Sequence, residues 1–204
     1  MIRSAMDPGG GPIPEMAEAP APIPLVGWGS LALVAIPVGA LVMALASHQF
    51  VYLDYVHVMS GGLWTGIDLF MGLVIGPILF RLPSAARADF VQHLVPTMLF
   101  LMPTLASVTV TAGIYLALLE HIFNLHYLSI DLAGVLVILL MAQGLGIFLP
   151  NEVRIVLELR RARPDARRIG RLGLFNARLA GLQAVFQIAL IFVMANLASG
   201  LVNL

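Results

Sequence analysis

The side chains best able to do chemistry lie in one short stretch, HVMSGGLWTGIDLFMG, residues 57–72. It places His57, Trp64 and Asp68 in a run of apolar residues typical of a membrane-spanning helix. A carboxyl group at the middle of a bilayer costs about 3 kcal/mol even on the most permissive insertion scale, and such residues mark ion pathways, proton relays and ligand sites. Asp68 therefore needs a hydrogen-bonding partner, a proton or a water-filled cavity.

Helical spacing puts these residues on one face. Intervals of three or four residues connect Asp54, His57, Gly61, Trp64, Asp68, Gly72 and Gly76. The glycines would allow a neighbouring helix or a flat ring to approach closely. We expect this stripe to face the protein interior, with Asp68 about 16 Å deeper in the membrane than His57.

Two other apolar segments carry polar residues that could meet this stripe. In the last segment, Asn176, Gln183 and Gln187 share a face, and Gln183 comes level with Asp68. We therefore predict a hydrogen bond between Asp68 and Gln183, with Arg178 as an alternative partner. In the third segment, His93, Thr97, Phe100, Thr104, Ser107, Thr111 and Tyr115 recur at helical spacing and are expected to line an interior seam.

The composition identifies the elements that must position these residues. Of the 204 residues, 60% are hydrophobic and only 11% are charged, which indicates an integral membrane protein. The expected fold is an all-α bundle of five transmembrane helices in one domain, residues 25–204, after a proline-rich disordered tail at 1–24. The spans are expected at about 25–47, 51–80, 91–119, 128–149 and 172–200.

The arginines predict how the bundle is oriented. All eleven basic residues are arginine, and seven of them lie between 154 and 171. Arg81 and Arg87 occupy the connection between the second and third spans. The positive-inside rule then places the amino terminus in the cytoplasm and the carboxyl terminus outside. We expect an integral protein of the bacterial inner membrane whose partners are lipid and a second subunit, either another copy or a complex partner, and not nucleic acid.

A metal site is one interpretation of the end of the bundle opposite the arginines. The chain has no cysteine, so a metal would be held by nitrogen, oxygen or methionine sulfur. His57, His121, His126 and Asp131 all fall near this end and could receive copper or zinc. No phosphate-binding loop, serine-histidine-aspartate arrangement or HExxH motif is present, which disfavours nucleotide-driven and ordinary hydrolytic chemistry.

The pattern of His57, six residues, Trp64, Thr65 and Gly66 resembles the opening helix of the HemJ-type protoporphyrinogen oxidase family and of the related CopD-like membrane proteins. The segments TAGIYLAL, HYLSIDLAGVLVILLMAQG and RLGLFNARLAGLQAVFQIALIFVM are similar to the later helices of that group. The similarity covers residues 51 to about 200. One departure is Asp131, which stands before Leu132 where that family has a lysine.

The resemblance implies a haem b-binding redox protein with His57 as an axial ligand. On this hypothesis the haem lies near the outer surface, His126 is the leading second ligand, Gly61 and Trp64 border the ring, and Asp68 is a buried proton site or a hydrogen-bond anchor. A CopD-like resemblance implies instead that the outer histidines and Asp131 handle copper. A structural subunit, in which the polar stripes only hold helices together, is the third possibility.

Overall fold

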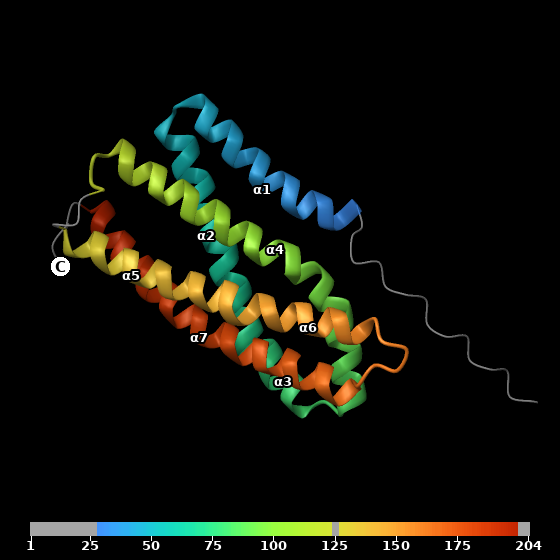
Figure 1. Ribbon diagram of the computed structural model, residues 1–204. Coiled ribbons are helices and arrows are strands. Elements are labelled where there is room, and N and C mark those ends of the chain that lie inside the picture. The colour runs from blue at the N-terminus through green and yellow to red at the C-terminus, as the bar shows by residue number, and fades with distance from the viewer. Residues whose placement is uncertain (1–27, 124–126, 200–204) are drawn as a thin grey trace, which may run out of the picture.

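The computed structural model describes residues 28–123 and 127–199, and every regular element in these two ranges is helical. Figure 1 shows them as one elongated bundle. In chain order the elements are α1 (Trp28–Ser47), α2 (Phe50–Phe70), η1 (Met71–Ile75), α3 (Gly76–Arg81), α4 (Ser84–Leu119), α5 (Leu128–Gln143), η2 (Gly144–Phe148), α6 (Leu149–Leu159) and α7 (Ala166–Ala198).

Four helical stretches are long and apolar enough to cross a membrane, as expected of a helical membrane protein. They are Phe50–Arg81, Ser84–Leu119, Leu128–Leu159 and Ala166–Leu197. Large apolar side chains such as Met59, Leu73, Ile138 and Phe192 are exposed on them, as lipid contact requires. The apolar stretch of α1, Leu31–Ser47, is shorter than these four, so five membrane crossings stay a prediction.

Several helices extend beyond the predicted spans at the arginine-rich end. The third predicted span starts at 91, but α4 begins at Ser84, and α7 begins at Ala166 where 172 was predicted. The fourth predicted span ends at 149, and its helix continues through α6 to Leu159, in agreement with the helical spacing of NEVRIVLEL. Asp165 caps α7 by accepting hydrogen bonds from the backbone N–H groups of Arg167 and Arg168. Hydropathy marks the part of a helix that lies in lipid, and these helices continue past it.

Two wide helical turns of the π type interrupt the spans, and each one precedes a proline. In η1 the N–H of Gly76 bonds to the carbonyl of Met71, one residue before Pro77. In η2 the N–H of Leu149 bonds to the carbonyl of Gly144, one residue before Pro150. Proline has no N–H to donate, and a wide turn is one way for a helix to continue through that position.

The helices that hold the site are packed very closely. The α2–η1–α3 span lies against both α4 and α7. A Cβ atom built on Gly72 would lie 2.3 Å from the Cα atom of Gly181, so the backbones of η1 and α7 touch. This contact explains the glycine at position 72, because any side chain there would separate the two helices.

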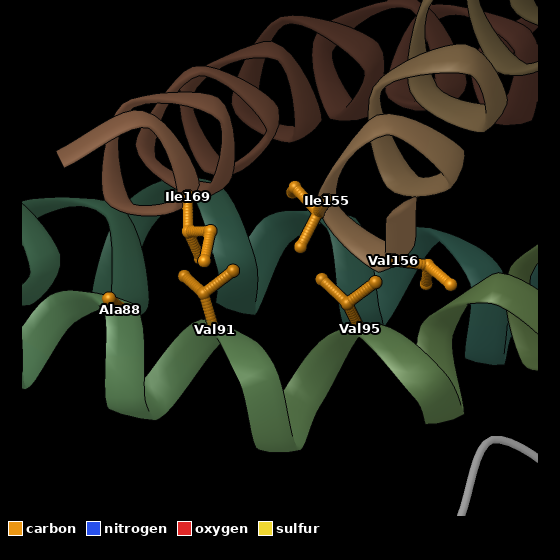
Figure 2. Close-up of a cluster of buried hydrophobic side chains, with 6 residues drawn as sticks. All are labelled: Ala88, Val91, Val95, Ile155, Val156 and Ile169. Carbon is orange, nitrogen blue, oxygen red and sulfur yellow. The ribbon is translucent and has the colours of Figure 1, made fainter. Parts of the chain in front are cut away.

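A cluster of apolar side chains closes the arginine-rich end of the bundle. It comprises Ala88, Val91, Val95, Ile155, Val156 and Ile169. Figure 2 shows these side chains meeting between α4, α6 and the start of α7. The loop between α6 and α7 lies at the same end as the turn between α3 and α4 (Figure 1), so both arginine-containing connections share one end, as the sequence predicted.

Candidate functional site

Asp68 on α2 lies at the centre of a buried polar cluster. Its side chain is 1% exposed, and its Oδ2 atom accepts hydrogen bonds from Nε2 of Gln183 and from Nε2 of Gln187, each at 3.0 Å. The predicted bond to Gln183 is confirmed, and Gln187 adds a second donor. No arginine pairs with Asp68 in the described part of the chain, so Arg178, which stacks on the ring of Phe80, is not its partner.

Three oxygen atoms of the polar cluster have no hydrogen-bond donor among the described residues. Oδ1 of Asp68 takes no hydrogen bond from any described residue. The Oε1 atoms of Gln183 and Gln187 are buried and also have no partner there. Buried acceptors without donors are costly, so this cluster is chemically suited to a proton, to water or to another donor-rich species.

A cavity of about 100 Å³ lies beside this cluster. Its wall is mostly apolar and includes Trp64, four methionines and Phe148. The methionines are Met71, Met98, Met102 and Met141. Its polar lining includes Asp68 and Gln183, together with Asn176 and Glu152. Apolar clefts with a few convergent polar groups are the usual form of ligand and substrate sites.

Glu152 is a site residue that the sequence analysis missed. It lies on α6, is 7% exposed and lines the same cavity as Asp68. It lies in the charged segment NEVRIVLEL, whose helical spacing indicates a helix that continues past the membrane, and no role was predicted for it. The helical spacing of Glu152, Ile155 and Val156, all of which are buried, was the signal that could have identified an inward face.

His57 is oriented by a hydrogen bond to α4. Its Nδ1 atom lies 2.8 Å from the carbonyl oxygen of Thr109, and because a carbonyl can only accept, Nδ1 carries the hydrogen. Nε2 is then a free lone-pair donor when the ring is neutral. The ring packs against Gly113, where a Cβ atom would lie 2.7 Å from Cε1. This is the arrangement of many metal-ligating histidines, whose other nitrogen donates to a carbonyl.

The residues predicted to surround a haem with His57 have different neighbours. Gly61 packs on the methyl group of Thr109, at 3.1 Å from a built Cβ atom. Trp64 borders the cavity of Asp68, and His57 lines neither that cavity nor the groove beside Gly62 and Gly66. His57 therefore fits an axial ligand, while Trp64 lines a cavity that neither His57 nor Gly61 borders.

The remaining predicted metal residues are spread out. His121 is exposed in a left-handed backbone conformation, with φ of 56°, just after the end of α4. Asp131 is half-buried in the first turn of α5, and His126 lies outside the described residues. Within residues 28–123 and 127–199, no three histidine, aspartate or glutamate side chains are grouped to hold a metal ion.

The predicted interior stripe of the third span is largely wrong. On α4 His93 and Tyr115 are exposed, and the hydroxyl of Thr104 bonds to the carbonyl of its own helix at Phe100. Of the predicted set, Ser107 does line the cavity. The polar contact with α2 comes instead from Thr109, whose Oγ1 donates to Oγ of Ser60 at 2.9 Å.

Comparison of the chain with protein-family models, with curated proteins and with solved structures finds no match.

Proposed function

We propose that this protein transfers protons within the membrane, and that Asp68 is the group that takes up and releases the proton. The observation that supports this most strongly is that the two carboxyl oxygens of Asp68 have different hydrogen-bonding partners. Oδ2 holds both glutamine donors, while Oδ1, without a donor among the described residues, belongs to a side chain that lines the cavity.

The geometry suits both protonation states. When Asp68 is ionised, the amides of Gln183 and Gln187 stabilise the charge through Oδ2. When a proton binds at Oδ1, Oδ2 can still accept the same two hydrogen bonds. The polar cluster therefore does not need to rearrange when the proton arrives or leaves.

Asp68 has no ion-pair partner among the described residues, which favours a carboxyl group that exchanges a proton over one that stays ionised. A permanently ionised carboxyl in a protein interior is usually paired with a cation. In the described part of the chain the partners of Asp68 are neutral amides.

On the positive-inside rule, the cavity of Asp68 extends toward the cytoplasmic side of a bacterial inner membrane.

The test is proton flux in sealed proteoliposomes that contain a pH-sensitive dye, driven by a potassium diffusion potential. We expect flux with the wild-type protein and its loss with Asp68→Asn, which keeps the shape and an acceptor oxygen. Asp89→Asn is the matched control, because Asp89 is an exposed aspartate on α4. Equal flux in wild type and Asp68→Asn would refute the proposal.

A second candidate is a haem b site with His57 as an axial ligand, supported by the free Nε2 atom that the Thr109 bond creates. Bound haem would supply one-electron chemistry. The test is the oxidised and reduced absorption spectrum with a pyridine haemochrome assay. Haem that is lost in His57→Ala and kept in His93→Ala, an exposed histidine, would support it. Full haem content in His57→Ala would exclude it.

A further inference from the structure

We infer that Glu152 is a second proton-binding group, which relays protons across the cavity between the arginine-rich end of the bundle and Asp68. This inference rests on the proposed role of Asp68 and adds to it a direction and a partner. The basis is that Glu152 lines the same cavity and has no hydrogen bond or ion pair with any described residue. A buried carboxyl is costly unless it is hydrogen-bonded or neutralised, so Glu152 needs a proton or water from the cavity.

The spacing of the two sites along the bundle follows from the hydrogen bonds that Asp68 and Asn151, the neighbour of Glu152, make with α7. Asn151, next to Glu152, donates from Nδ2 to Oδ1 of Asn176 at 3.0 Å. Asp68 binds Gln183, seven residues further along the same helix. With a rise of 1.5 Å per residue, the two sites are roughly 10 Å apart along the axis. This distance is too long for direct transfer and suits a short chain of water molecules.

The cavity has room for such a chain. Its volume is about 100 Å³. One water molecule needs roughly 10–15 Å³ of this kind of space and two or more polar partners. Asn176 and Glu152 offer partners at one end, and Asp68 and Gln183 offer them at the other. The cavity can therefore hold several waters that are anchored at both ends.

The proton balance is simple. An O–H bond of the Glu152 carboxyl breaks, a water molecule carries the proton, and an O–H bond forms at Oδ1 of Asp68. No electrons are transferred, and reprotonation of Glu152 from the arginine-rich side completes the relay. The same steps run in reverse for release.

A polar contact beside Glu152 joins its neighbour Asn151 to the arginine-rich surface. Nη1 of the exposed Arg154 donates to Oδ1 of Asn151 at 3.2 Å. The apolar cluster of Val91, Val95 and Ile155 fills the space between α4 and α6 (Figure 2). Protons from the arginine-rich surface would therefore pass along the Asn151 side of α6.

The charged groups around Glu152 are engaged elsewhere. Glu158 on α6 pairs with Arg161 in the following connection and with Arg168 on α7. Arg178 stacks on Phe80, and Arg171 is exposed. On α4, Arg87 donates to the backbone carbonyls of Leu79 in α3 and Leu82 in the turn after it. Asp89 and His93 are exposed and pair with each other. Among the described residues, Asp68 is the other ionisable side chain in the cavity wall.

The test measures hydrogen-deuterium exchange of the protonated Asp68 carboxyl by infrared spectroscopy after rapid mixing of the whole protein with D2O. The Asp68 band is assigned by its loss in Asp68→Asn. We expect Glu152→Gln to slow this exchange by about a hundredfold, the low end of what a positioned acid-base group contributes. Glu152→Asp should restore much of the rate. Glu120→Gln, a change at an exposed glutamate at the other end of α4, is the matched control.

The outcomes separate the two proposals. Unchanged exchange in Glu152→Gln, or slowing by Glu120→Gln to the same extent, would overturn the relay even if Asp68 carries flux. If Glu152→Gln slows exchange at Asp68 but the wild-type protein shows no proton flux, the relay from Glu152 to Asp68 is supported. Proton transfer as the function of the protein is then refuted. If Glu152→Gln fails to fold, Asn151→Leu tests the same path, and normal exchange in that variant would overturn the inference.

Discussion

Gln183 donates a hydrogen bond of 3.0 Å to Asp68 from a helix that lies 115 residues further along the chain. The bond joins α2 to α7 in the middle of the bundle, where water is scarce and a polar group without a partner is costly. It therefore links the stability of the bundle to the chemistry of Asp68.

The first prediction concerns the stability of Asp68 variants. Asp68→Leu leaves the amide N–H groups of Gln183 and Gln187 without an acceptor and should cost roughly 1–3 kcal/mol of unfolding free energy. Asp68→Asn keeps an acceptor oxygen and should cost clearly less. Detergent-induced unfolding followed by circular dichroism gives both values. A larger loss of unfolding free energy in Asp68→Asn than in Asp68→Leu would contradict the hydrogen-bonding arrangement.

The second prediction concerns the contact between η1 and α7. Gly72→Ala places a methyl group 2.3 Å from the Cα atom of Gly181, so the helices must move apart. We expect a loss of about 1–3 kcal/mol in unfolding free energy, as for other overpacked positions. Gly62→Ala is the control, because nothing lies within 4 Å of a Cβ atom there. If both variants unfold alike, the close approach is incorrect.

The third prediction concerns the orientation of His57. We expect the neutral ring to carry its hydrogen on Nδ1, since Nδ1 faces the carbonyl of Thr109. Nitrogen NMR of labelled histidine reports this tautomer. Gly113→Ala should displace the ring and change the His57 signal, whereas Gly134→Ala, with nothing within 4 Å of the added atom, should not. An Nε2–H tautomer in the wild type would contradict the bond.

The fourth prediction concerns Glu158, which is 3% exposed and lies 3.2 Å from Arg161 and 3.1 Å from Arg168. Its Oε1 atom also accepts the backbone N–H of Asp165. Glu158→Ala should lower the unfolding free energy by about 1 kcal/mol, because the arginines are partly exposed and keep their hydration. Raising the salt concentration should reduce the difference from wild type. A difference that is independent of salt would show that the ion pairs contribute little.

Helix counting predicted the bond between Asp68 and Gln183 because both residues stand in uninterrupted apolar segments, where depth follows from position. Glu152 was not predicted as a site residue, because it lies beyond the apolar part of its helix, where charged side chains usually face solvent, while that helix continues to Leu159. Reading a helix end from hydropathy confuses the boundary of the lipid with the boundary of the helix.

The polar stripe on the third span was misplaced for a different reason. A threonine in a membrane helix can satisfy its hydroxyl on its own backbone, as Thr104 does with Phe100, so its polarity does not require an interior position. The buried face of α4 instead carries small and branched apolar residues such as Val91, Val108 and Ala112. Which neighbour each face meets depends on the packing of the helices, which one sequence does not contain.

The central claim, that Asp68 binds and releases a proton, is tested most directly by the infrared spectrum of its carboxyl group as a function of pH. The account predicts a protonated carboxyl band that disappears and returns reversibly as the pH is raised and lowered, and that is absent from Asp68→Asn. An Asp68 carboxyl that keeps one protonation state over the whole pH range in which the protein is folded would contradict it.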